Sequence, residues 1–402
     1  MASQPGRLDP LAFEDFDTAH ADFAELRAGC PVARSEAFGG FHAVLGHAEV
    51  SEVLRQPRRY ITSVQNVVPK VAFTGRRPPL HLDPPEHTPY RQALNPFFTE
   101  ARVAAFAPVV ERHVRELLAP YVAAGGGDLC REFTRRLPGH VFADLFHLST
   151  EQSMQIKATS EVYNEALQNG DDDGVKQTSL ELYDLARDII EQRQRSPLDP
   201  ADDITSALLA KRVDGEPLPP EMVLGTIRQM IVVGMIAPSV FIGAMAVHLA
   251  RHPELQARLR ADLDLVPAAV EEYLRLLTPY RGFARTSVDD TEIAGVPIPA
   301  GEPIALVYAA ANRDPAVFPD PDEFVLDRPD IDRHLAFGFG PHRCAGEGLA
   351  RELLRATLRA LLDSTSSIEE AAPPTMTRWP EWGTLSAPLV VRAATSGESG
   401  KA

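Results

Sequence analysis

The fold of this chain is decided by the stretch Phe337-Gly338-Phe339-Gly340-Pro341-His342-Arg343-Cys344-Ala345-Gly346-Glu347-Gly348-Leu349-Ala350-Arg351. It places one cysteine between a glycine-rich loop and the start of a helix. The two glycines of the loop allow the backbone to bend sharply or to approach a flat ligand, and the proline stiffens it. The helix is predicted by leucines that recur at three- and four-residue steps, namely Leu349, Leu353, Leu354, Leu358, Leu361 and Leu362.

Cys344 is therefore expected just before a helix N-terminus, where free backbone N–H groups and the helix dipole favour a thiolate. Such a loop suits a sulfur that is held out rigidly as an axial ligand to iron. A lone cysteine is more often an inert buried residue. The glycines, the histidine and the helix onset in one register favour the ligand over that alternative.

This stretch resembles the haem-binding loop of the cytochrome P-450 family. The resemblance implies haem b as the cofactor and Cys344 as its metal ligand, with a thiolate that favours O–O cleavage. It implies a mainly α fold with small β-sheets, in which the haem lies between a long distal helix and the proximal loop and helix that carry the cysteine. By the same resemblance, His342 contacts a haem propionate, and Phe337 and Gly338 also bind the cofactor.

Composition bounds the class of protein. The chain has 402 residues and a formal net charge of −16, so we expect no nucleic-acid partner, which would need a basic surface. Three cysteines argue against a disulfide framework and fit a reducing cytoplasm. We recognise no signal-peptide core and no apolar run of membrane-spanning length, so no membrane partner is expected.

The domain organisation is predicted to be simple. The resemblance runs from about Asp15 to Arg392, and no linker divides the chain. We expect one catalytic domain over residues 11–392, with flexible ends at residues 1–10 and 393–402.

Most of the chain is predicted to be helical. Helical spacing of apolar residues is clear over three segments, residues 99–124, 153–170 and 176–194. Pro219-Pro220 then opens a long apolar helix that continues to about Ala250. Strand signals are few. Phe41–Leu45 is one, and residues 291–298 with residues 304–307 indicate a hairpin.

Glu272 and Arg275 lie three residues apart, which puts both on one helical face. An ordinary surface ion pair would be worth little. The resemblance instead implies a buried Glu-x-x-Arg pair that a downstream arginine completes, and Arg328 is the matching residue. We assign these three residues a structural role.

Three further residues are expected around the haem. His87 and Arg91, four apart in the segment His81–Arg91, share one helical face, and the resemblance implies that they meet a propionate. Charge-assisted bonds from arginine to a carboxylate are strong and directional. Arg285 matches a third propionate-binding position of the family.

The distal helix departs from the family pattern. Typical members carry an acid and a threonine here, which organise proton delivery to bound dioxygen. Gly234 matches the family, whereas Ile236 replaces the acid and Ala237 replaces the threonine. Pro238 cannot donate to the carbonyl of Gly234, so a kink is expected and that carbonyl is free to accept a hydrogen bond. Ser239 should point elsewhere on the helix.

Three explanations of this departure remain open. The enzyme uses dioxygen with protons from water or from a substrate hydroxyl; it uses hydrogen peroxide; or it performs a coupling or rearrangement instead of oxygen insertion. The first is favoured because most members of the family use dioxygen. A non-catalytic haem sensor is the alternative from a different class.

The substrate pocket is expected to be apolar and partly aromatic, which fits a hydrophobic or aromatic small molecule. Arg281 is the polar exception and either binds a substrate carboxylate or has a structural role. The candidate pocket residues are Val67, Phe73, Met230, Val233, Ala237, Arg281, Phe283 and Leu385.

An electron-transfer partner is expected on the cysteine side. The resemblance implies a ferredoxin and a ferredoxin reductase. Local basic charge could steer an acidic partner despite the acidic total. The basic residues that cluster there in sequence are Arg333, His334, Arg343, Arg351 and Arg355.

Overall fold

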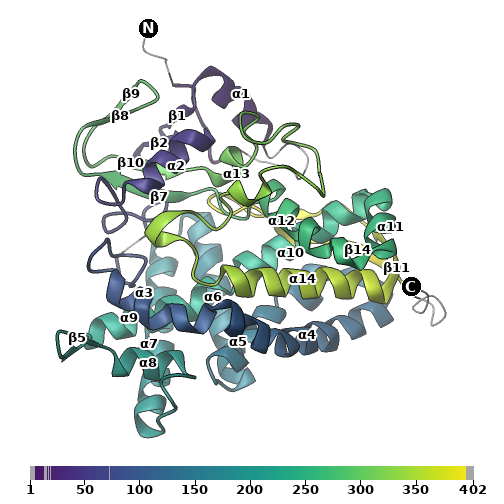
Figure 1. Cartoon of the computed structure of the whole chain (residues 1–402), viewed down its shortest axis with the longest axis horizontal. Coiled ribbons are helices and arrows are strands. Elements are labelled where there is room, and N and C mark those ends of the chain that lie inside the picture. Colours follow the sequence, from purple (N-terminus) through teal and green to yellow (C-terminus); the bar gives the residue numbers. More distant parts are fainter. Residues whose placement is uncertain (1–4, 13–15, 17, 19, 72, 395–402) are drawn as a thin grey trace.

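The computed structural model describes residues 5–12, 16, 18, 20–71 and 73–394 (Figure 1). Parts of both ends that we expected to be flexible, residues 1–4 and 395–402, lie outside the described residues, as does Asp15.

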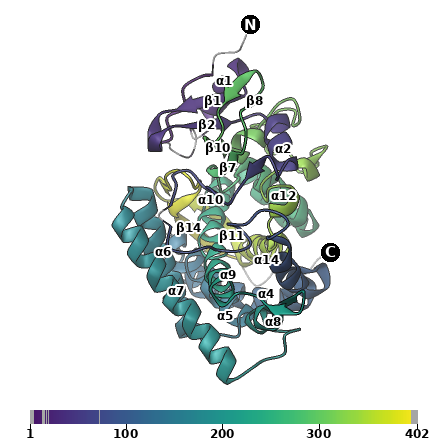
Figure 2. The same ribbon diagram turned by 90° about the vertical axis from the view of Figure 1, so that its left-hand side faces the viewer.

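Helices form most of the structure (Figures 1 and 2). They include three long helices close to the segments expected from sequence, α4 (Glu100–Ala123), α6 (Thr150–Asn169) and α7 (Asp172–Arg195). The other helices are α1 (Ala21–Gly29), α2 (His47–Arg55), α3 (Thr88–Leu94), α5 (Leu137–Leu145), α8 (Ile204–Ala210), α9 (Pro220–Val233), α10 (Ala237–Arg251), α11 (Pro253–Ala261), α12 (Val266–Leu276), α13 (Tyr308–Ala311) and α14 (Glu347–Ser364).

The strands form small sheets. The largest has the order β1-β2-β10-β7-β3, in which only β2 and β10 run parallel. Its strands are β1 (Val32–Ser35), β2 (Phe41–Val44), β3 (Tyr60–Ile61), β7 (Phe283–Ser287) and β10 (Pro303–Leu306). A second sheet has the order β11-β14-β4, from β4 (Gly126–Asp128), β11 (Thr365–Glu370) and β14 (Pro388–Ala393). Three two-stranded ribbons are built from β5 (Arg212–Val213), β6 (Glu216–Pro217), β8 (Thr291–Ile293), β9 (Val296–Ile298), β12 (Thr375–Met376) and β13 (Thr384–Ser386).

The predicted hairpin is partly wrong. Residues 291–298 do form one, β8 with β9, around Ala294 and Gly295, which both have positive φ. Residues 304–307 do not pair with it. They enter the large sheet as β10, between β2 and β7, because the apolar side chains of Ile304 and Leu306 are buried there.

Two apolar cores support the helical part. One joins α4, α10, α12 and α14, and the other joins α6, α7 and α9. Helices α9 and α10 pass through the interior between these layers (Figure 2). Most side chains on both helices are therefore buried, and they are positioned by packing from several directions.

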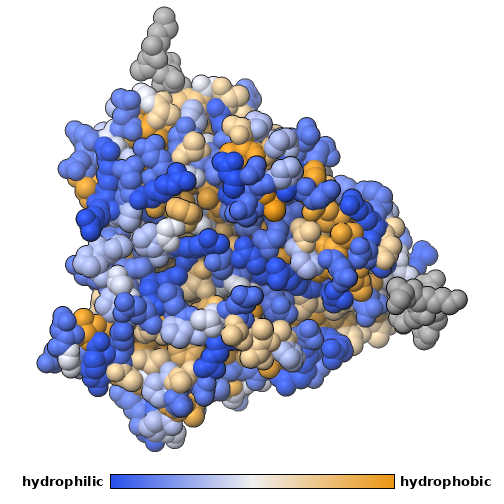
Figure 3. All heavy atoms as spheres, in the orientation of Figure 1, coloured by the Kyte–Doolittle hydropathy of each residue, from blue (hydrophilic) through white to orange (hydrophobic). Residues whose placement is uncertain are grey.

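The long apolar helix predicted from Pro220 is two helices. Helix α9 ends at Val233 and α10 begins at Ala237, so Gly234, Met235 and Ile236 form a break. The segment Pro220–Arg251 is long and apolar enough to cross a membrane, contrary to our reading of the sequence, but most of it is buried inside the protein. Hydrophilic residues cover much of the face shown in Figure 3, with hydrophobic residues in smaller patches.

Candidate haem site

The cysteine loop is held by backbone contacts. The amide of Cys344 donates to the carbonyl of Phe337 at 2.9 Å, which closes the loop ahead of α14. Gly338 and Gly340 have φ angles of 69° and 73°, a region that side chains disfavour. A Cβ at position 340 would also lie 2.8 Å from the carbonyl oxygen of Leu54. The sequence therefore requires glycine here to present the sulfur.

Cys344 differs from the other two cysteines. Cys30 and Cys130 are buried among apolar residues, whereas the side chain of Cys344 faces open space. Desolvation by the surrounding protein nevertheless raises the pKa of the Cys344 thiol. The amide of Gly346 and the nearby Arg91 oppose the shift only in part. We expected the helix start to favour a thiolate, and the structure shows that burial outweighs it.

Four basic side chains lie close to one another, and one of them, Arg91, also lies near the sulfur. The rings of His87 and His342 meet edge to face, with centroids 4.7 Å apart. Arg91 is close enough to lower the pKa of both histidines, and Arg285 lowers that of His342, although burial is the larger cause for each ring. The pKa of His342 falls to about 2. The structure thus brings together the four residues expected to meet the haem propionates.

Among the described residues, one carboxylate forms an ion pair with this cluster. Asp83 Oδ1 lies 3.9 Å from Nε2 of His342, and Asp83 also accepts hydrogen bonds from the backbone amides of Thr62 and Ser63. His87 Nε2 lies 3.0 Å from the carbonyl of Pro341, but its buried Nδ1 has no partner among the described residues. The thiol beside Arg91, with Arg285 and two histidine rings close by, is a donor set that fits haem b and its two propionates.

A buried charge network joins the cysteine side to the rest of the fold. Arg275 donates two hydrogen bonds to the carboxylate of Glu272 at 2.7 and 2.8 Å, and Arg328 donates at 2.9 Å. The two arginines also donate to backbone carbonyls, including that of Glu323. All three side chains are buried. The predicted downstream arginine therefore completes the network as expected, with the geometry of a scaffold.

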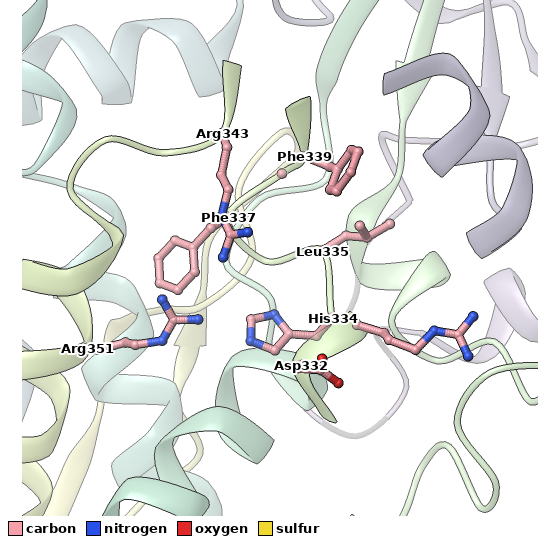
Figure 4. A pocket seen from close by; sticks show the side chains of 9 residues that line it. Asp332, His334, Leu335, Phe337, Phe339, Arg343 and Arg351 are labelled. Carbon is pink, nitrogen blue, oxygen red and sulfur yellow. The ribbon is translucent and has the colours of Figure 1, made fainter. Parts of the chain in front are cut away.

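A second network lies beneath the loop (Figure 4). Arg351 donates to Glu271 and Glu347, each at 2.8 Å, and lies over the ring of Phe337. His334 Nε2 lies 3.1 Å from Glu271. Arg351, Phe337 and His334 also line a pocket of about 90 Å³, which Figure 4 shows. The charge of Arg351 is thus neutralised within the protein, so this residue contributes little to the attraction of an acidic electron-transfer partner.

The distal helix breaks above this region. The break confirms the predicted kink, but Pro238 is not its only cause, because the close packing of Gly234 against Phe142 also contributes. Pro238 lies in the first turn of α10, and a Cβ at Gly234 would lie 1.9 Å from the ring of Phe142. Ser239 is buried and donates to the carbonyl of Met235 at 2.9 Å. Its hydroxyl is therefore bonded within its own segment, which agrees with our expectation that Ser239 does not replace the family threonine.

The predicted pocket residues do not all converge. Val67 and Phe73 line one pocket of about 80 Å³, and Phe283 bridges to Val67. Met230 is buried in the core of α6, α7 and α9, whereas Val233, three residues on, is exposed to open space. The remaining two aliphatic residues, Ala237 and Leu385, are partly exposed.

Arg281 is engaged by the protein. It is buried, lies over the ring of Trp379 at 5.6 Å, and donates to the carbonyl of Glu381 at 2.8 Å. The backbone amide of Arg281 donates to Pro380. These contacts favour the structural role over a substrate clamp at this position.

Sequence reasoning missed two buried arginines, Arg77 and Arg228. The sequence pattern that could have revealed them is Arg228, because it is the one charged residue of α9 after the first turn of that apolar helix. A charge inside an apolar helix is costly to bury and therefore informative.

Known proteins match the chain over most of its length. Residues 140–390 match the family described as Cytochrome P-450. Mycinamicin IV hydroxylase/epoxidase from Micromonospora griseorubida is 33% identical, over 77% of this chain and 78% of that protein. Nocardicin C N-oxygenase from Nocardia uniformis subsp. tsuyamanensis is 32% identical, over 95% and 96%. The structure of the cytochrome P-450 CYP109Q5 from Chondromyces apiculatus superposes with a TM-score of 0.85 at 29% identity, covering 98% of this chain and 100% of that one.

Proposed function

Because the chain belongs to the cytochrome P-450 family and is a haem b monooxygenase of that family, we propose that Cys344 supplies the axial thiolate. The observation that carries this assignment is that the one exposed cysteine lies near Arg91, a member of the basic cluster. The bound haem supplies dioxygen activation, which electron donation from a thiolate favours.

The basic cluster holds the cofactor in this proposal. His87, Arg91, Arg285 and His342 bind the propionates, the two guanidinium groups by ion pairs and the two imidazoles by hydrogen bonds. Phe337 and Gly338 complete the proximal wall. We place the whole catalytic unit in residues 11–392.

Protons reach the distal side without a family acid or alcohol. Ile236 and Ala237 carry no titratable or hydroxyl group, and Ser239 is bonded back to Met235. The carbonyl of Gly234 has no donor at residue 238, because Pro238 lacks an N–H. We propose that this carbonyl holds a water or a substrate hydroxyl that delivers the proton.

The oxidant distinguishes this account from its alternatives. Purified haem-loaded protein with NADPH and a surrogate ferredoxin and ferredoxin reductase should oxidise a substrate. Turnover with hydrogen peroxide alone, and none with reductants, would overturn the dioxygen mechanism. A haem protein that binds a small molecule but turns it over with neither oxidant would favour the sensor alternative.

The substrate is proposed to be a hydrophobic or aromatic small molecule. Apolar residues such as Val67, Phe73 and Phe283 support this. The relatives named for mycinamicin IV and nocardicin C support a role in bacterial secondary metabolism.

A ferredoxin is proposed to dock beside the cysteine loop, in the cytoplasm. Arg333 and Arg343 are exposed there, as is the ring of Phe339. Arg351 is neutralised by two glutamates and Arg343 pairs with Glu347 at 2.8 Å, so Arg333 is the arginine most available to an acidic partner.

A further inference from the structure

Two guanidinium groups lie together in the protein interior, away from the cysteine cluster. Arg77 precedes α3 in the chain, and Arg228 lies on α9. Only 8% and 1% of these residues are exposed. The two charges repel each other. Burial is the largest cause that lowers the pKa of Arg228, to about 10, and the charge of Arg77 is the next largest.

The contacts of Arg228 are aromatic and neutral. Its guanidinium lies 5.1 Å from the ring centroid of Tyr163 and 5.9 Å from that of Tyr183. It donates to the hydroxyl of Ser179 at 3.3 Å. Such stacking accounts for one buried arginine. It does not account for a second cation beside it.

Neither arginine has an anionic partner among the described residues. Nε of Arg77 and Nε of Arg228 are both buried without a hydrogen bond. The buried carboxylate of Glu381 lies in the same part of the fold, but Asn164 and Gln168 donate to it at 2.8 and 2.6 Å. Burying unpaired charge is costly, so the pair calls for an anion from outside the chain.

A pocket reaches Arg77, beside which Arg228 lies. Its volume is about 80 Å³, and its described lining includes Lys70, Arg76, Arg77 and His81 but no carboxylate. Nε2 of His81 is also buried without a partner. The rest of the lining combines apolar side chains, including Val67 and Phe73, with neutral polar ones such as Gln65. The wall therefore combines basic groups with an apolar surface.

The arginine loop is fixed against two helices. A Cβ at Gly225 would lie 1.9 Å from the carbonyl oxygen of Arg76, so α9 meets the loop backbone directly. Tyr183 on α7 donates to the same carbonyl at 3.3 Å. Because the loop is held from both sides, Arg77 is preorganised beside Arg228.

We infer that Arg77 and Arg228 bind the carboxylate of a substrate whose remaining body is hydrophobic. The inference rests on the proposed function and narrows its substrate class to acids. Arg228 lies six residues before Gly234, roughly 9 Å along a helix axis. Oxidation is therefore directed at carbons remote from the acid group.

The test is calorimetric titration of the haem-loaded protein with octanoate, decanoate and dodecanoate, and with the matching primary alcohols. At least one acid should bind about tenfold more tightly than its alcohol, since a hydrogen bond to a charged group is worth about that factor. Arg77→Gln and Arg228→Gln should each remove the preference while leaving alcohol affinity within about twofold. Lys70→Gln is the control, because it removes an exposed charge from the same pocket and should retain most of the preference.

The outcomes are decisive in both directions. No preference for any acid, whether both ligands bind equally or neither binds, would overturn the inference. A preference that survives in both arginine variants would also overturn it. Thermal unfolding of each variant establishes that it is folded. A thiolate spectrum that persists without acid preference would leave the proposed function standing, so the two failures are distinguishable.

Discussion

Glu272 and Arg275 face each other across one turn of α12, joined by hydrogen bonds of 2.7 and 2.8 Å, with neither side chain exposed. Arg275→Leu should lower the free energy of unfolding by about 3–5 kcal/mol, because it removes one partner of a buried charge network. Urea unfolding measures the change. Arg187→Leu is a matched control, since Asp184 and Arg187 have the same spacing on the surface of α7 and should contribute about 1 kcal/mol or less. Equal losses in the two variants would contradict the scaffold role.

The helix break depends on close packing between Gly234 and Phe142. Gly234→Ala should lower the free energy of unfolding by about 1–3 kcal/mol, because the new methyl group overlaps the ring. Adding Phe142→Leu should recover part of that loss. The double-mutant cycle measures the coupling. Additive effects of the two substitutions would show that the ring does not set the break.

Pro238 is predicted to govern proton delivery more than stability. It lies in the first turn of α10, where proline is tolerated, so Pro238→Ala should change stability by less than about 1 kcal/mol. The alanine N–H can occupy the carbonyl of Gly234, and we expect less product per NADPH consumed. Pro253→Ala, at the first turn of α11, is the control and should leave this ratio unchanged. An unchanged ratio in Pro238→Ala would contradict the proposed role of the carbonyl.

Glu271 is predicted to make part of the stability depend on pH. Burial raises the pKa of this carboxyl, but hydrogen bonds from His334 and Arg351 outweigh that effect and lower it to about 2. Because the pKa is lowered in the folded state, ionised Glu271 stabilises the fold at pH values above its ordinary pKa near 4.5. This stabilisation is lost as the pH falls from 4.5 toward 2. The stability gap between wild type and Glu271→Gln should therefore shrink over that range.

The size of this gap is on the order of 2–3 kcal/mol at neutral pH. Chemical unfolding at a series of pH values measures it. Glu292→Gln, on the exposed side of β8, is the control and should show no such gap. A gap for Glu271→Gln that stays constant down to pH 3 would contradict the assignment.

Local patterns in the sequence predicted the parts of the fold that local forces determine. The leucine repeat placed α14 correctly, and glycine at 338 and 340 marked a loop whose φ angles exclude most side chains. Ile304 and Leu306 were wrongly predicted to pair within a local hairpin, because their actual partners on β2 come from a distant part of the chain. Spacing alone carries no information on such contacts.

The site shows the same division. Family motifs located the residues around Cys344, while the engagement of Arg281 by Glu381 and Trp379 became visible only in three dimensions. Arg77 and Arg228 were missed because they lie far apart in sequence and meet only through the packing of α9 against the loop.

The central claim is that Cys344 is the axial thiolate. Its most direct test is the absorption spectrum of the reduced, carbon monoxide-bound protein, recorded for the wild type, Cys344→Ala and the control Cys130→Ala. We predict a thiolate-type spectrum for the wild type and for Cys130→Ala, and its loss in Cys344→Ala. A thiolate-type spectrum that persists in Cys344→Ala would contradict the account.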